Sequence, residues 1–223
     1  GAPMQAYSRF EMVVEVCLHS DLHIAGVGRA AALIDRCIET DVRGRPIIPG
    51  TAFKGRVRAH YERLLQALGF DLKGCKPPDP ATMCQDPANL CPVCSLFGSP
   101  VQQSRIEFST LEPVSDTSDT LITRIGIGIN RQLNTVAEGR LFFYEAAPCN
   151  ELRFRGAVRG WATEQEVALL AGAMKLITHF GGQKARGLGR ATVEIKSLYQ
   201  LGDSGWHSVN LSTVLHTLRE VAP

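Results

Sequence analysis

Two segments of the sequence combine glycines with lysine and arginine side chains. They are Pro46–Arg58 (PIIPGTAFKGRVR) and Gly181–Arg190 (GGQKARGLGR). Glycine allows another backbone to approach closely, because it has no side chain to keep that backbone away. Lysine and arginine pair with phosphate oxygens without reading base sequence. Together, the two segments predict a protein that binds RNA by its backbone.

The first segment is the predicted start of a helix that runs to about Leu68. With Thr51 as the N-cap, Lys54 lies in the first turn, where a cation opposes the helix dipole at a cost of about 0.3–1 kcal/mol. A phosphate bound to the free N–H groups of that turn would make the cation favourable, and Gly50 and Gly55 would let it come close. The alternative is an ordinary solvated basic face. The candidate RNA ligands here are Thr51, Lys54, Arg56 and Arg58.

The second segment follows a predicted helix and enters a predicted strand, the reverse of a dinucleotide-binding turn. Its four glycines surround three further candidate phosphate ligands, which are Lys184, Arg186 and Arg190. The alternative interpretation is a flexible surface hairpin.

Four cysteines lie together in one proline-rich stretch of twenty residues. They are Cys75, Cys84, Cys91 and Cys94. The final pair forms the C-x-x-C half-site that is typical of zinc, and four sulfurs indicate a closed, structural Zn²⁺ site. Isolated thiols are the alternative, and His60 is a weaker substitute for the most distant cysteine. We expect the other three cysteines to be small core residues; they are Cys17, Cys37 and Cys149.

Composition limits the class of protein. The 223 residues are 44% hydrophobic, which suits one domain over positions 4–223 with insertions, and Gly1–Pro3 resembles the remnant of a cleaved tag. Lysine and arginine number 24 against 22 acidic residues, so any affinity for nucleic acid must be local. No apolar run of 18 residues and no signal peptide is present, so we expect a soluble, cytoplasmic protein without a membrane partner.

The pattern of elements predicts an α+β fold. The predicted helices run from Thr51 to Leu68, with an apolar stripe, and from a Thr163–Glu166 capping box to His179. The predicted strands are Glu11–Ser20, Arg105–Leu111, Leu141–Ala146, Glu151–Arg159 and Ala191–Gln200. Their order is that of a ferredoxin-like, RRM-like βαββαβ core, with a zinc-binding insertion over 70–100 and a protruding thumb hairpin over 112–140. The last twenty residues are expected to form a short C-terminal extension.

In order and spacing, five strings resemble the RAMP (repeat-associated mysterious protein) superfamily, and within it the backbone subunits of type III CRISPR effector complexes. The strings are LHIAG (22–26), LIDRCIETD (33–41), PIIPGTAFKGRVR (46–58), INRQLNTVAEGRLFFYE (129–145) and GGQKARGLGRATVEI (181–195). Ala25 stands where LHIGG-like strings have their first glycine, and the zinc-binding insertion is found in only some members. The chain therefore resembles a variant of the family.

The resemblance implies a function and partners. Several copies would stack with other RAMP subunits as a filament along a CRISPR RNA, beside the large signature subunit of the effector. A target RNA would pair with this guide and be cut at each thumb, by an endoribonuclease in the prokaryotic cytoplasm. The protein would read the backbone while base pairing supplies sequence specificity.

The resemblance also implies roles for individual residues. Asp35 matches the family's catalytic aspartate, which would act with a divalent cation such as Mg²⁺, and Asp41 is the reserve candidate. His23 would shape the same loop or touch RNA, and Asn130 and Arg131 match the thumb region. The alternative role for Asp35 is to cap local backbone.

Three rival functions remain open. The chain could hold the guide without cutting, or it could process CRISPR-repeat RNA with His179 as the general base. Unrelated to RNA, it could be a zinc-stapled protein-interaction module.

Overall fold

The structure, a computed structural model, describes residues 6–19, 39–114, 152–178 and 190–219. Its strands are β1 (Ser8–His19), β2 (Glu39–Thr40), β3 (Pro46–Ile47), β4 (Ile106–Phe108), β5 (Glu112–Pro113), β6 (Leu152–Ala162), β7 (Arg190–Gly202) and β8 (Gly205–Ser208). Its α-helices are α2 (Gly50–Ala67), α3 (Pro92–Phe97), α5 (Glu164–Lys175) and α6 (Leu211–His216), and its 3₁₀ turns are η1 (Pro80–Thr82) and η2 (Thr217–Arg219).

The main sheet has the strand order β4-β6-β1-β7-β8, and β5 also pairs with β6. Every pairing in it is antiparallel, and β1 lies between β6 and β7. In chain order, the four core strands β4, β6, β1 and β7 are the second, third, first and last. This is the ferredoxin-like arrangement, so the predicted fold class is confirmed.

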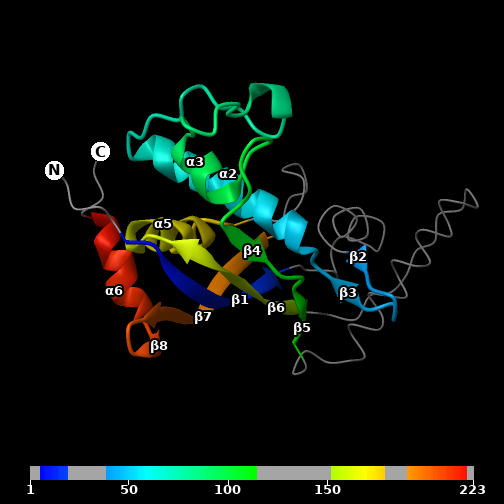
Figure 1. The fold of residues 1–223 in the computed structure, drawn as a ribbon. Helices are drawn as coiled ribbons and strands as arrows, with labels where there is room; N and C mark the ends of the chain where they lie inside the picture. The colour runs from blue at the N-terminus through cyan, green and yellow to red at the C-terminus, as the bar shows by residue number, and fades with distance from the viewer. Residues whose placement is uncertain (1–5, 20–38, 115–151, 179–189, 220–223) are drawn as a thin grey trace, which may run out of the picture.

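One face of the sheet carries the core. Alternate residues of β1 point the same way, and Phe10, Met12, Val14 and Val16 are all fully buried. Helices α2 and α5 pack beside each other on this face, and the cysteine-rich segment lies beyond α2, away from the sheet (Figure 1). Among the described helices, none is both long and apolar enough to cross a membrane.

Helix α2 begins two residues earlier than predicted, because its N-cap is Pro49 rather than Thr51. Pro49 is its N-cap and makes no side-chain cap, so the prediction that Thr51 caps the helix is wrong. Gly50 starts the helix because it packs on β4, where a Cβ atom would lie 2.2 Å from the Phe108 carbonyl oxygen. At the other end, Gly69 has a φ of 86° and its N–H donates to the Gln66 carbonyl, which confirms the predicted C-terminal cap.

The predicted capping box of α5 is confirmed, because Thr163 and Glu166 exchange both hydrogen bonds. The helix ends at Lys175 rather than at His179. The chain turns there because Ile177 is buried in the core and the Thr178 carbonyl accepts the N–H of Ala191, at the start of β7. The base of the glycine-rich segment is therefore tied to the sheet.

Two further parts differ from prediction. The strand predicted over Arg105–Leu111 is regular only over β4, because beyond it Leu111 pairs with Ile48, next to α2. The C-terminal residues add β8 to the sheet and α6 to the helical layer, where a short extension was expected. The strand predicted over Leu141–Ala146 lies outside the described residues, as do Cys37 and Cys149, whereas Cys17 is buried as expected.

Candidate functional site

The four clustered cysteines converge on one point. The sulfur atoms of Cys75, Cys84, Cys91 and Cys94 all lie within 4.8 Å of one another. A tetrahedral zinc with Zn–S bonds of about 2.3 Å separates its ligand sulfurs by about 3.8 Å. Four cysteine sulfurs at this spacing fit a structural zinc ion, and His60 is not part of the group. The prediction that these four cysteines lie together is confirmed.

Backbone N–H groups orient two of the sulfurs. The Cys91 thiol is the N-cap of α3 and accepts from the Cys94 N–H at 3.3 Å, with Pro92 favouring the start of the helix. The Cys84 sulfur accepts from the Cys91 N–H, also at 3.3 Å. Such hydrogen bonds stabilise thiolates, which are the form that binds metal.

Burial acts on the thiol pKa values in the opposite direction. It raises the pKa of Cys75 to about 11 and also raises that of Cys91. At Cys84 burial is the largest single influence and acts to raise the pKa, but the hydrogen bonds from Cys91, Cys94 and Cys75 together outweigh it and the pKa is lowered. Buried thiols of this kind bind a metal by giving up their protons, so metal binding and folding of the segment are linked.

Arg58 connects the cysteine cluster to α2. Its guanidinium donates to the Cys94 sulfur at 3.3 Å and to the Gly98 carbonyl at 2.9 Å, and it lies over the Phe97 ring. A zinc bound by four thiolates carries a net negative charge, which this cation would offset. Arg58 was predicted to meet RNA phosphates; the structure instead directs its guanidinium towards the cysteine cluster.

The remaining predicted ligands of α2 lie along its first two turns. Thr51 is exposed, and Lys54 and Arg56 are half-buried. Burial, and then the positive charge of Arg58, lowers the pKa of Lys54. Apart from the helix itself, no heavy atom of the described residues lies within 4 Å of where a Cβ atom on Gly55 would be, so this side of the helix offers open space at the residue after Lys54.

The segments that carry the other predicted site residues begin or end at one end of the sheet. The Cα of Leu18 pairs with that of Leu152, His19 pairs with Arg190, and the Val114 N–H donates to the Arg153 carbonyl. Segments 20–38, 115–151 and 179–189 thus enter and leave the described fold at this end. The Ile48–Leu111 bridge brings the start of α2 to the same place.

Six predicted site residues fall within those segments and lie outside the described residues. They are His23, Asp35, Asn130, Arg131, Lys184 and Arg186. Arg190 begins β7, and only its backbone is described. The topology therefore brings together the ends of the segments that carry these residues, although the segments are far apart in the chain.

Asp41, the reserve catalytic candidate, has a local role. Its carboxylate accepts the N–H groups of Arg43 and Arg45 and the Arg45 side chain, closing the turn between β2 and β3. The hydrogen bond from the Arg45 backbone is the main cause of the lowered Asp41 pKa. The structure thus gives Asp41 the backbone-capping role that was the alternative considered for Asp35.

A buried ion cluster on β1 and β6 was not predicted. Glu15 is only 2% exposed and accepts from Arg153 at 2.9 Å and from Arg155 at 2.8 Å. Burial is the largest single influence and acts to raise the Glu15 pKa, but the hydrogen bonds from the two arginines and the nearby charge of Lys196 together outweigh it and the pKa is lowered. Strand alternation places Arg153 and Arg155 on the face away from the helices, a signal that the sequence already contained.

Comparison with known proteins identifies the family. The RAMP superfamily model matches residues 18–193, which is most of the chain. The chain belongs to the RAMP superfamily. No curated protein sequence matches it significantly.

Solved structures share the fold of this RAMP chain. A chain of the Csm3–Csm4 subcomplex in a type III-A CRISPR-Cas interference complex matches with a TM-score of 0.50 and 16% identity, covering 98% of each chain. Csm3 of Methanopyrus kandleri matches with a TM-score of 0.54 and 16% identity, over 89% of this chain and 78% of that one. At this level of identity the similarity shows a common fold.

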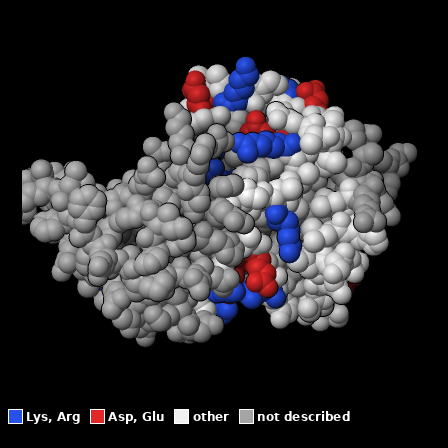
Figure 2. All heavy atoms as spheres, turned by 180° about the vertical axis from the view of Figure 1, so that it is seen from behind, with Lys and Arg blue, Asp and Glu red and all other residues white. Residues whose placement is uncertain are grey.

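The charge of the RAMP chain is local rather than general. On the described atoms of the face in Figure 2, basic and acidic side chains are scattered instead of forming one continuous basic surface. This agrees with the net charge of +2. Any affinity for RNA must therefore come from a few placed cations and from backbone groups.

Proposed function

We propose that this RAMP protein is a guide-holding backbone subunit of a type III CRISPR effector complex, and that it cuts RNA paired with the guide. The observation that carries the proposal is the convergence at one end of the sheet. The start of α2 and the boundaries of the three segments with the other predicted RNA ligands meet there. Residues from remote parts of the sequence can then contact one RNA backbone.

The α2 start is suited to a phosphate. Pro49 leaves the first N–H groups of the helix without a side-chain cap, and no acidic side chain lies in the first turn. A phosphate there would accept from these N–H groups and pair with Lys54, whose lowered pKa reflects burial and the nearby Arg58. The open space beside Gly55 admits the sugar-phosphate chain.

The cysteine cluster is assigned to zinc with a structural role. All four ligands come from the chain itself, which leaves no ligand position for a substrate. Zinc would hold the segment between α2 and β4 in place and, through Arg58, the middle of α2.

Cleavage is assigned to Asp35, in the segment between β1 and β2. RNA carries its own nucleophile, the 2′-hydroxyl, and a positioned carboxylate can assist its deprotonation. A divalent cation such as Mg²⁺, when bound, would stabilise negative charge on the scissile phosphate. The thumb of the family, here predicted over 112–140, would splay a base and align the 2′-oxygen in line with the bond that breaks.

RNA binding is tested by salt dependence. Lys54→Ala should weaken binding of a CRISPR RNA and reduce the slope of log K against log salt by about 0.7, the value for one phosphate contact on a single strand. Arg63→Ala is the matched control, because Arg63 is exposed and lies farther along α2. An unchanged slope for Lys54→Ala would remove the α2 start from the RNA site.

Cleavage is tested in the assembled complex. Asp35→Ala should abolish cutting of the target RNA and leave guide binding intact, whereas Asp41→Asn should still cut if it folds. Unchanged cutting by Asp35→Ala would exclude Asp35 from the active site. If the unsubstituted complex binds target without cutting it, the protein is a non-catalytic guide-holding subunit.

A further inference from the structure

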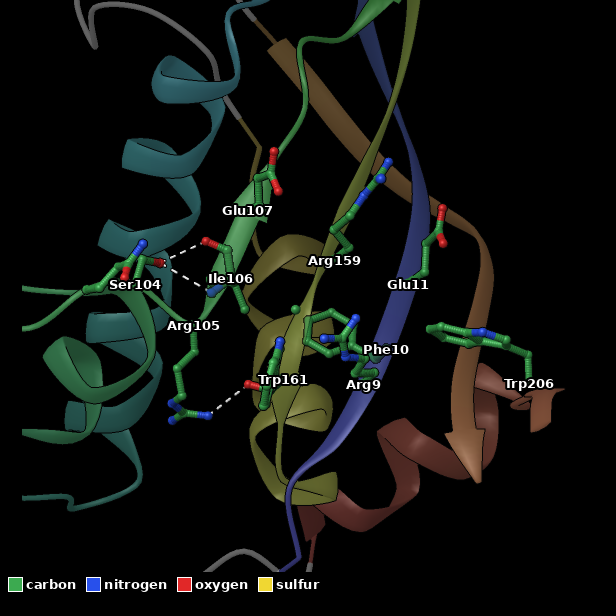
Figure 3. A pocket seen from close by; sticks show the side chains of 12 residues that line it. Arg9, Phe10, Glu11, Ser104, Arg105, Ile106, Glu107, Arg159, Trp161 and Trp206 are labelled. Atoms are coloured by element: carbon green, nitrogen blue, oxygen red, sulfur yellow. Dashed lines mark hydrogen bonds between the residues drawn. The ribbon is translucent and has the colours of Figure 1, made fainter. Parts of the chain in front are cut away.

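The helix-free face of the sheet has a cavity at its other end. It has a volume of about 590 Å³ and lies where β1 begins and β6 ends. Trp161 and Trp206 line it and are 54% and 52% exposed, unusually high for such large apolar side chains. Figure 3 shows Arg9 and Glu11 between the two indole rings, as the strand order β6-β1-β7-β8 requires.

Charged side chains lie beside the two indole rings of the cavity. The Arg9 guanidinium lies over the Trp161 ring, 4.8 Å from its centre. Arg159 is exposed, and its neighbours across the sheet are Glu11 on β1 and Glu107 on β4. The cavity thus combines flat π surfaces with both hydrogen-bond donors and carboxylate acceptors.

We propose that this cavity binds unpaired bases of single-stranded RNA. Proteins with an RRM-like sheet recognise single-stranded RNA by stacking its bases on aromatic and guanidinium planes of that sheet. Trp161, Trp206 and the Arg9 guanidinium offer such planes. Base edges carry both donors and acceptors, which match the carboxylates of Glu11 and Glu107 and the guanidinium of Arg159.

The distribution of charge favours RNA over a protein partner. The core of a protein–protein interface is depleted of charged residues, because burying them costs solvation. Here Arg9 and Glu11 lie on the strand between those of the aromatic rings, and Arg159 lies next to Glu11 across the sheet. A stacked base covers the rings and leaves the charged groups in contact with water or with its own polar edge.

This site is separate from the proposed guide site. Arg9 and Leu18 are nine residues apart on β1, which corresponds to roughly 30 Å along an extended strand. Three arginines and two glutamates line the cavity, but Arg105 is paired with Glu166. The charges of Arg9 and Arg159 therefore balance those of Glu11 and Glu107, so stacking rather than phosphate pairing supplies the affinity. Its binding should therefore depend little on salt, unlike binding at α2.

Intrinsic fluorescence reports on this cavity alone, because Trp161 and Trp206 are the only two tryptophans in the chain. Hexaadenylate RNA should quench the zinc-loaded, full-length protein saturably, with little change between 50 and 200 mM salt. A hexameric abasic ribose-phosphate strand should not quench. Lys54→Ala should weaken guide binding and keep the hexaadenylate signal, so the two proposals can fail independently.

Substitutions test whether the fluorescence change arises from base stacking at the two indole rings. Trp161→Phe and Trp206→Phe should each leave a quenchable tryptophan, and Arg9→Ala should weaken hexaadenylate binding about ten-fold, the order expected for one stacking partner. Leu176→Ala, which removes an exposed apolar side chain at the end of α5, should change nothing. Absent quenching, equal quenching by the abasic strand, or an unaffected Arg9→Ala would overturn the proposal. A signal that responds only to another protein subunit would also overturn it, and would assign the face to a protein interface.

Discussion

The guanidinium of Arg58 donates a hydrogen bond to the sulfur of Cys94, 3.3 Å away and 36 positions later in the chain. The same side chain reaches the Gly98 carbonyl, and its Nε atom is buried without a hydrogen-bond partner. Arg58 therefore joins the middle of α2 to the cysteine cluster. Substituting either Arg58 or Cys94 should therefore affect the structure around the other residue.

Arg58→Ala should lower both zinc affinity and the melting temperature. Removing a group that contacts a metal ligand commonly costs about 10–100-fold in metal affinity. Competition with a chromophoric chelator measures the affinity, and calorimetry measures the melting temperature. Arg63→Ala, exposed on the same helix, is the control. Equal zinc affinity in Arg58→Ala and the unsubstituted protein would contradict a role for Arg58 at the metal.

Metal removal should unfold the cysteine-rich segment. We expect one zinc per chain by elemental analysis, and a strong chelator should lower the melting temperature and expose the segment to proteolysis, because metal binding supplies part of its folding free energy. Cys91→Ser should lose the zinc, because it removes one of the four thiolates while a serine can still cap α3. Cys17→Ala, outside the cluster, should retain one zinc per chain; a metal-free protein of unchanged stability would refute the structural assignment.

The two glycines of the α2 start should respond oppositely to alanine. Gly50→Ala places a methyl group 2.2 Å from the Phe108 carbonyl oxygen, so we expect a loss of about 1–3 kcal/mol in the free energy of unfolding. Gly55→Ala meets nothing within 4 Å and should gain about 0.5–1 kcal/mol. If RNA passes beside Gly55, the second variant should nevertheless bind guide RNA more weakly. Urea unfolding and RNA titration separate the two effects, and guide binding as tight as normal would move the RNA away from Gly55.

Glu15→Gln should destabilise the fold in a pH-dependent way. The ion pairs with Arg153 and Arg155 lower the Glu15 pKa below its ordinary value of 4.5, so they stabilise the fold above that pH. This contribution is lost as the pH falls below 4.5 towards the lowered folded value. The variant should lose about 1–3 kcal/mol at pH 7. Unfolding free energies measured from pH 7 to pH 3 should converge at the acidic end, and a constant difference would exclude ionised Glu15 as the cause.

Local patterns in the sequence predicted the elements that depend on near neighbours. The Thr163–Glu166 capping box, the glycine that ends α2 and the alternation of β1 all involve residues a few positions apart, and all are confirmed. Contacts between distant residues were missed. The start of α2 was misplaced because its position depends on the packing of Gly50 against Phe108, which no local pattern reveals.

By itself, the sequence determined the order of the core strands and the two main helices, the family and the grouping of four cysteines into one cluster. Each follows from periodicity, spacing or short motifs, which act within one element or one loop. Only the tertiary structure decided where individual cations point. Arg58 and Lys54 lie on the same helix one turn apart, yet Arg58 reaches a sulfur that belongs to a later segment, whereas Lys54 lies beside open space. That difference depends on which segments pack on each side of α2, and this is fixed only when the whole chain has folded.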